Sequence, residues 1–114
     1  DFPFPETATI AEAPARLHDD LTQDELVYTH LVRATDIDMG RHMNNVVYIR
    51  LLLDCFSAKE LASGRVKSIE AHYASPCLEG ETLGVFCRRE DRLCRMAVRH
   101  ADGRAAVLAQ IVFG

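Results

Sequence analysis

The chain has 114 residues, a length that fits one domain and argues against two. Hydrophobic residues make up 48% and charged residues 26%, a balance that is typical of a globular protein and excludes a disordered one. Folding at this length buries roughly two-thirds of the surface, so a core can form without disulfide or metal staples. The net charge of −4 argues against a nucleic-acid binder, which needs a basic face.

The N-terminus and the cysteines bear on location. No run of eighteen apolar residues occurs, and the N-terminus lacks the basic start and apolar stretch of a signal peptide, so we expect neither membrane insertion nor secretion. The four cysteines, Cys55, Cys77, Cys87 and Cys94, lie in apolar runs without a CxxC pair or a Cys/His metal spacing. They favour buried free thiols in a reducing cytoplasm, and we expect no metal and no cofactor.

The first part of the chain differs from the rest. Residues 1–24 hold three of the four prolines and show no sustained period of two or 3.6, so we interpret them as an extended linker or arm. The domain is then expected over residues 25–114. From Leu26 to Asp36, β-prone residues alternate between two faces, which predicts a strand, and a polar loop follows it.

Residues 43–58 predict a helix that is apolar on almost every side. Asn44 or Asn45 is a suitable N-cap, and only Arg50 and Asp54 interrupt the apolar surface. A helix without a solvent-facing side is buried in a core. A four-strand meander is expected after it, over residues 65–77, 83–90, 93–100 and 104–113, with glycine-containing turns. This order predicts an α+β hotdog fold, in which a bent antiparallel sheet wraps around one long buried helix.

The loop before the helix is the densest functional signal, because it holds Asp36, Asp38, His42, Asn44 and Asn45. A helix N-terminus offers unpaired N–H groups to a developing oxyanion, and a carboxylate beside an imidazole can activate water. This chemistry suits acyl transfer to water, such as thioester hydrolysis. Structural roles are the alternative: turn caps for the aspartates, helix caps for the asparagines and a satisfied ring for the histidine.

The segment VRATDIDMGRHMNNVVYIRLLLD, residues 32–54, resembles the signature of acyl-acyl-carrier-protein thioesterases, the plant Fat type and their bacterial relatives. Their pattern, Asp-x-Asp-x-Asn-x-His-x-Asn-Asn-x-x-Tyr-Ile, is matched except at Gly40, where the family usually has Asn. A weaker match continues over residues 73–81, where Cys77 matches a cysteine of the plant members and Pro76 replaces a family carboxylate. The resemblance covers the second of the family's two hotdog repeats, which carries the catalytic residues.

The resemblance implies hydrolysis of fatty acyl thioesters, carried by acyl carrier protein or by coenzyme A, to free fatty acid. It assigns water activation to Asp38 and His42. The resemblance also implies that the substrate is contacted by Gly40, Asn44, Asn45 and Cys77. Possible substitutes for the missing carboxylate are Glu70, Glu79 and Glu81. An acidic carrier protein could dock on Arg33, Arg41 and Arg50, or on Arg88, Arg89 and Arg92, unless these arginines only form a solvated face.

Three other interpretations stay open. The chain could be an acyl-binding hotdog whose catalytic set is lost at Gly40 and Pro76, an inactive half of a double-hotdog thioesterase, or a dehydratase-type hotdog. Because a hotdog sheet leaves an edge open, we expect the chain to form a homo-oligomer or to pair with a second hotdog repeat.

Overall fold

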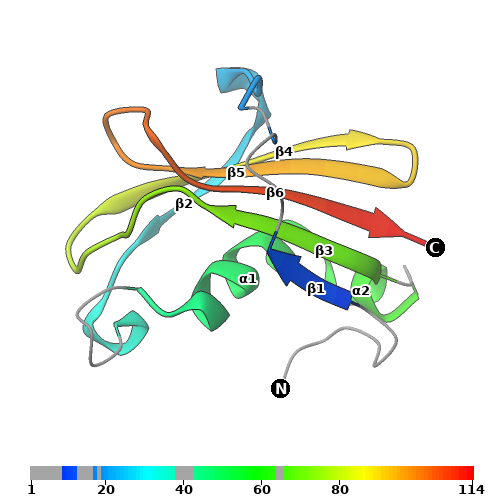
Figure 1. The fold of residues 1–114 in the computed structure, drawn as a ribbon, viewed down its shortest axis with the longest axis horizontal. Helices are drawn as coiled ribbons and strands as arrows, with labels where there is room; N and C mark the ends of the chain where they lie inside the picture. The colour runs from blue at the N-terminus through cyan, green and yellow to red at the C-terminus, as the bar shows by residue number, and fades with distance from the viewer. Residues whose placement is uncertain (1–8, 13–16, 18, 38–42, 64–65) are drawn as a thin grey trace.

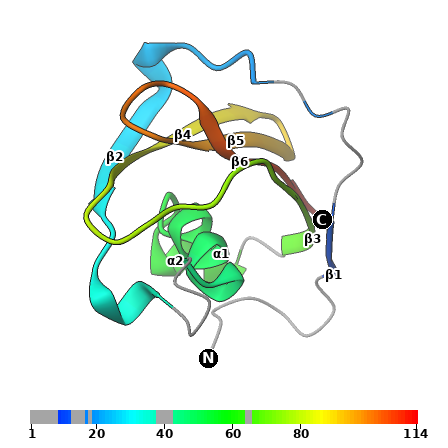
Figure 2. The ribbon, with the colours of Figure 1, turned by 60° about the vertical axis from the view of Figure 1, so that its left-hand side comes forward.

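The structure is a computed structural model that describes residues 9–12, 17, 19–37, 43–63 and 66–114. Its strands are β1 (Thr9–Glu12), β2 (Leu26–Leu31), β3 (Val66–Tyr73), β4 (Thr82–Glu90), β5 (Leu93–Arg99) and β6 (Ala105–Phe113). Its α-helices are α1 (Asn45–Leu53) and α2 (Ala58–Ser63), and short 3-10 helices cover Gln23–Glu25 and Ala34–Asp36. The sheet lies on one side of α1 in Figure 1 and curves around it in Figure 2. This arrangement confirms the predicted hotdog fold.

The sheet has the strand order β1-β3-β6-β5-β4-β2, in which β1 runs parallel to β3 and all other neighbours are antiparallel. The predicted four-strand meander is therefore wrong for its first strand, because β3 pairs with β6 and only β4, β5 and β6 follow one another. Residues 74–81 between β3 and β4 are longer than a usual hairpin loop and contain Pro76. They cross the end of the sheet instead of closing a hairpin.

The first predicted strand is also too long. It ends at Leu31, and residues 34–36 form a 3-10 turn instead. The Asp36 carboxylate accepts hydrogen bonds from the Arg33 N–H at 3.0 Å and from the His30 ring at 2.8 Å. This is the turn-capping role that we considered for Asp36, and it ends the strand because it satisfies the backbone locally.

The helix predicted over residues 43–58 ends early, at Leu53, and a second helix starts at Ala58. Asn44 is the N-cap of α1, and its side-chain oxygen accepts from the Val46 N–H at 2.7 Å. After Leu53 the chain turns, and Ser57 and Glu60 form a reciprocal capping box that starts α2, with N···O distances of 2.9 and 3.0 Å. The Ser-x-x-Glu spacing is visible in the sequence, so the break could have been predicted.

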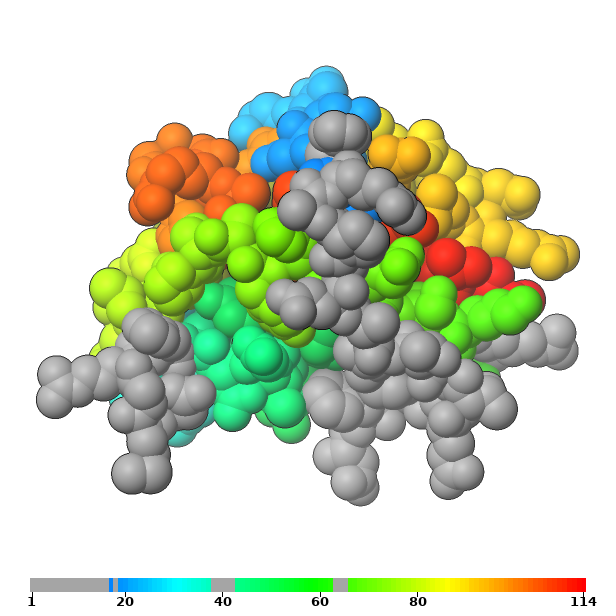
Figure 3. Space-filling view, in the orientation of Figure 1, coloured from blue at the N-terminus to red at the C-terminus, as the bar shows by residue number. Residues whose placement is uncertain are grey.

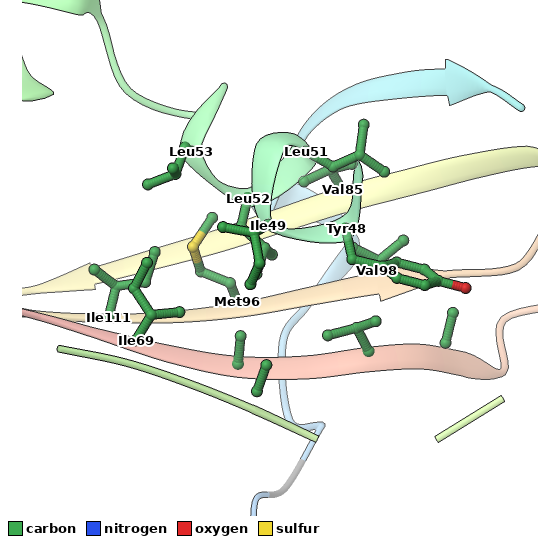
Figure 4. Close-up of a cluster of buried hydrophobic side chains, with 14 of the residues drawn as sticks. Tyr48, Ile49, Leu51, Leu52, Leu53, Ile69, Val85, Met96, Val98 and Ile111 are labelled. Atoms are coloured by element: carbon green, nitrogen blue, oxygen red, sulfur yellow. The ribbon is translucent and has the colours of Figure 1, made fainter. Parts of the chain in front are cut away.

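The core lies between α1 and the concave face of the sheet. Five of the nine residues of α1 are buried: Tyr48, Ile49, Leu51, Leu52 and Leu53. Figure 4 shows them above the strands, with Met96, Val98 and Ile111 among the side chains that meet them. The buried helix is therefore confirmed, although Val46 at its start is 44% exposed. Within the described part of the chain, no helix is long and apolar enough to cross a membrane.

The segment that precedes β2 packs on the convex face of the sheet. Leu21 contacts a small second cluster that contains Phe86 and Leu108. Arg99 binds the Asp19 carboxylate, with Nε at 2.9 Å, and so ties the same segment to β5. Strand β1 lies within residues 1–24, which we interpreted as an extended arm. The domain boundary between residues 24 and 25 stays a prediction.

Candidate functional site

The loop that carries the proposed catalytic residues begins and ends at paired positions. Ile37 and Met43 form an isolated antiparallel bridge, and the Asn44 N–H donates to the Asp36 carbonyl at 3.1 Å. The Met43 N–H donates to the Cys77 carbonyl at 3.0 Å, which ties this loop to the segment after β3. Three predicted site residues between these anchors, Asp38, Gly40 and His42, lie outside the described residues.

A pocket of about 360 Å³ opens beside these anchors, at the N-terminal end of α1. Its walls are Met43, Asn45, Tyr48, Tyr73, Ala74, Ser75 and Pro76. In the space-filling view of Figure 3, α1 borders β3 and the segment after it at the molecular surface. Of the predicted substrate contacts, Asn45 is exposed and lines this pocket, whereas Asn44 uses its side chain to cap the helix.

Cys77 lies behind the pocket and not on its wall. Its side chain is fully buried, and its backbone N–H donates to the Tyr48 hydroxyl at 3.0 Å. Burial raises the pKa of the Cys77 thiol, and the nearby Glu81 charge adds to this, although the Tyr48 hydroxyl opposes it. Burial also raises the pKa of Tyr48. The Cys77 thiol is therefore protonated at neutral pH, which makes it a poor nucleophile.

A chain of hydrogen bonds lies next to Cys77. The ring of His100, a buried histidine, has Nδ1 at 2.6 Å from a Glu81 carboxylate oxygen and Nε2 at 2.7 Å from the Ser75 hydroxyl. The other Glu81 oxygen accepts from the Leu78 N–H at 2.7 Å. Burial alone would raise the pKa of Glu81, but the hydrogen bonds from His100 and Leu78 outweigh it and lower the pKa below its usual value. Glu81 is therefore ionised at neutral pH and holds the imidazole in a fixed orientation.

Among the described residues, one group has donor atoms close enough together to bind a metal ion: Cys77, Glu81 and His100, all within 4.8 Å of one another. The His100 ring already uses both nitrogens, toward Glu81 and toward Ser75. These partners satisfy the buried imidazole without an ion. We therefore describe the group as a hydrogen-bonded cluster.

The two arginine groups differ in how they are paired. Arg88 binds Glu25 through Nε at 2.7 Å, and Arg89 binds Glu60, so the charges of both are compensated. Arg33 and Arg50 are exposed, and neither forms an ion pair with a described residue. Arg92 of the second group is also exposed, and Arg41 of the first group lies outside the described residues. Among the described residues, the first group therefore has two arginines without an ion pair and the second group has one.

Sequence reasoning did not find the Ser75–His100 contact. Glu81 was named as a substitute for the missing carboxylate, but nothing connected it to His100, 19 residues later. The available signal was the alternation within each strand. Ser75 and His100 each lie two residues beyond an inward-facing strand residue, Tyr73 at the end of β3 and Val98 one residue before the end of β5.

The chain was compared with known proteins. The family model for the acyl-ACP thioesterase C-terminal domain matches residues 19–113. Among solved structures, an acyl-ACP thioesterase from Bacteroides thetaiotaomicron superposes with a TM-score of 0.79 at 24% identity, covering 90% of this chain and 42% of that one. A protein from Lactobacillus plantarum described as an oleoyl thioesterase gives 0.74 at 19% identity, with 90% and 42% covered. The 12:0-ACP thioesterase from Umbellularia californica gives 0.72 at 18% identity, with 85% and 38% covered.

A search of curated proteins found no match. The chain spans less than half the length of each of the three solved structures. Their identities show a shared fold, and the family model extends over nearly the whole chain. The chain belongs to the acyl-ACP thioesterase C-terminal domain family.

Proposed function

We propose that the chain hydrolyses fatty acyl thioesters, carried by acyl carrier protein or by coenzyme A, to free fatty acid. One observation carries the proposal: the loop with the family signature is anchored by Met43 beside a pocket at the N-terminal end of α1. The match to the acyl-ACP thioesterase family supports the same activity.

In this proposal the thioester carbonyl enters the pocket beside the start of α1. The N–H groups of Val46, Val47 and Tyr48 already donate to Asn44. The helix dipole favours negative charge at this end, and the Asn45 N–H would help it to stabilise the oxyanion as it forms. Asp38 and His42 orient and deprotonate the water, and Asn45 contacts the substrate from the pocket wall. The contacts proposed for Gly40, Asn44 and Cys77 stay predictions. Of these, Gly40 has only its backbone N–H to offer.

The partner that we propose is a second hotdog unit, either another copy of the chain or a first repeat. Strand β2 is an edge of the sheet and pairs only with β4 among the described strands. It exposes Val27 by 48% and Leu31 by 46%, and an open apolar edge of this kind favours pairing with another strand. The solved structures from Bacteroides thetaiotaomicron and Lactobacillus plantarum are more than twice as long as the part this chain covers, which leaves room for such a unit.

Arg33 and Arg50 are the residues that we propose to meet an acidic carrier protein, because both are exposed and unpaired within the described part of the chain. Charges of this kind mainly raise the rate of encounter, and salt weakens them. A cytoplasmic location stays a prediction.

The test is hydrolysis of acyl-carrier-protein and acyl-coenzyme A substrates of several lengths by the purified chain. We expect Asp38→Asn and His42→Ala to lower the rate by roughly 10²–10⁴-fold, as for the loss of a general base. Asp91→Asn is the matched control. Asp91 is exposed in the turn between β4 and β5, at the far end of the sheet, and has φ of 57°, which asparagine adopts as readily.

Hydrolysis that survives in both loop variants would refute the assignment of Asp38 and His42. A folded chain that hydrolyses none of the substrates would refute the activity for the chain alone. In that case acyl binding without turnover would support the acyl-binding alternative, and activity regained with an added first repeat would support the half-enzyme.

A further inference from the structure

Three polar side chains meet at one end of the sheet, outside the loop to which the proposed function assigns catalysis. Ser75 follows β3, Glu81 precedes β4, and His100 follows β5. The Ser75 hydroxyl oxygen lies 2.7 Å from His100 Nε2, and His100 Nδ1 lies 2.6 Å from a Glu81 oxygen. A nucleophile, a base and an orienting carboxylate connected through these ring nitrogens are the arrangement that activates a serine.

Each member is held in place by a further contact. Glu81 keeps its second oxygen on the Leu78 N–H at 2.7 Å, so the carboxylate cannot rotate away from the ring. The side chain of His100 is only 4% exposed, which removes competing water from the imidazole. Ser75 is half-buried and is one of the residues that line the 360 Å³ pocket, so the third member borders a space that a ligand can enter.

We propose that Ser75, His100 and Glu81 form a catalytic triad in which Ser75 is the nucleophile that is acylated by the substrate. For its substrate the inference rests on the proposed function, and it divides the hydrolysis into two steps. The family carboxylate is replaced here by Pro76, the residue next to Ser75. His100, at the end of β5, would then be the base in place of the carboxylate that is missing at position 76.

The proton positions are consistent with this role. The Ser75 hydroxyl has one proton and two acceptors in reach, the Ala105 carbonyl at 2.9 Å and His100 Nε2 at 2.7 Å. In the structure the hydroxyl donates to the Ala105 carbonyl, and its oxygen then accepts from Nε2. When the hydroxyl rotates to donate to Nε2, that nitrogen can accept the proton. The second arrangement is the reactive one.

In the first step Ser75 Oγ attacks the thioester carbonyl carbon, and its proton moves to His100 Nε2. The carbon–sulfur bond breaks, and the leaving thiolate takes that proton, which gives a free thiol and an acyl ester on Ser75. In the second step water, oriented by the loop residues Asp38 and His42, attacks the ester carbonyl, and in this mechanism His100 replaces those residues as the base that deprotonates it. One water proton passes by way of His100 Nε2 to Ser75 Oγ as the carbon–oxygen bond breaks, and the fatty acid leaves.

The primary experiment treats the purified chain with a fluorophosphonate probe and maps the modified peptide by mass spectrometry. A serine hydroxyl activated by a base displaces fluoride from phosphorus and stays labelled, whereas a structural serine does not react. We expect one label per chain, on Ser75. His100→Gln should slow the labelling by roughly 10²–10⁴-fold. Ser68→Ala, a half-buried serine in β3, is the matched control and should keep the wild-type rate.

The labelled peptide is identified in the wild-type chain, so this result holds even if a variant fails to fold. Ser75→Ala, checked by circular dichroism, then tests the thioester reaction with dodecanoyl-coenzyme A. Loss of both the label and the hydrolysis supports the triad. An unlabelled Ser75, or hydrolysis at the wild-type rate in folded Ser75→Ala, overturns it and leaves the proposed function in place. Labelling of Ser75 in a chain that hydrolyses no thioester supports the triad and overturns the proposed function instead.

Discussion

Replacing Tyr48 by phenylalanine removes one oxygen atom from the boundary between the core and the pocket. The side chain of Tyr48 is only 3% exposed, and its hydroxyl accepts the Cys77 N–H at 3.0 Å. Cys77 is fully buried, so after Tyr48→Phe its N–H has no water to replace the lost acceptor. The phenyl ring keeps its contact with the Tyr73 ring of β3, so the loss of the hydrogen bond is the main change.

The expected cost follows from the asymmetry of buried hydrogen bonds. An unsatisfied buried donor costs about 1–3 kcal/mol, more than the net value of an ordinary hydrogen bond. The unfolding entropy of a chain of this length is about 0.24 kcal/mol/K, from roughly 2.1 cal/mol/K per residue. Tyr48→Phe should therefore lower Tm by about 4–12 °C.

Urea and thermal unfolding followed by circular dichroism measure this loss. Tyr28→Phe is the matched control, because the Tyr28 hydroxyl donates to the Leu51 carbonyl at 2.5 Å but its side chain is only half-buried. Because Tyr28 is half-buried whereas Tyr48 is only 3% exposed, the control should lose less stability than Tyr48→Phe. If Tyr48→Phe cost no more than the control, the Cys77 N–H would not depend on Tyr48, and the argument from burial would be refuted.

Four further outcomes are expected. Leu52→Ala, at a side chain with no exposed surface, should cost about 2–5 kcal/mol in urea unfolding, and a cost below 1 kcal/mol would contradict the central position of α1. Asn44→Ala should cost about 1 kcal/mol by removing the helix cap, whereas Asn44→Asp should cost less. The pKa of Glu81 is lowered in the folded chain, so its contribution to stability is present above its unfolded pKa of about 4.3 and is lost as pH falls through its folded pKa. Glu81→Gln should therefore flatten this part of the pH–stability curve. An unchanged curve would contradict the pairing of Glu81 with His100. Dialysis against a chelator should leave Tm unchanged, because hydrogen bonds already satisfy the polar groups of the cluster formed by Cys77, Glu81 and His100. A drop in Tm that added zinc reverses would show that this cluster binds a metal ion.

The elements with a strong local pattern could be predicted from the sequence. The apolar pattern of α1 predicted a helix with almost no solvent-facing side, and this implied a sheet that curves around it; in the structure Val46 and Arg50 are nevertheless exposed. The turns after β3 and β5 were expected at glycines, and Gly80 and Gly103 both have φ near +90°, which other residues rarely adopt. Local conformational preference determines both features, so one sequence was sufficient.

Pairing between distant strands could not be predicted in the same way. The partners β3 and β6 are separated by two complete strands, and nothing in either sequence specifies the other. The meander was the interpretation with the shortest connections, and it failed because β2 takes the position beside β4. The break after Leu53 is different, since Ser57 and Glu60 displayed a capping box that the apolar pattern obscured.

The register of the sheet explains why the triad residues meet. Tyr73 of β3, Val107 of β6, Val98 of β5 and Val85 of β4 are paired in one row across four strands. Inward-facing positions recur every second residue, so continuing from this row past the strand ends gives Ser75, His100 and Glu81 on the same side of the sheet. A shift of one residue in any of these pairings would turn one member outward. The pairing that buries the core therefore also assembles the polar cluster, and the proposed chemistry at Ser75 depends on the same register as the stability of the fold.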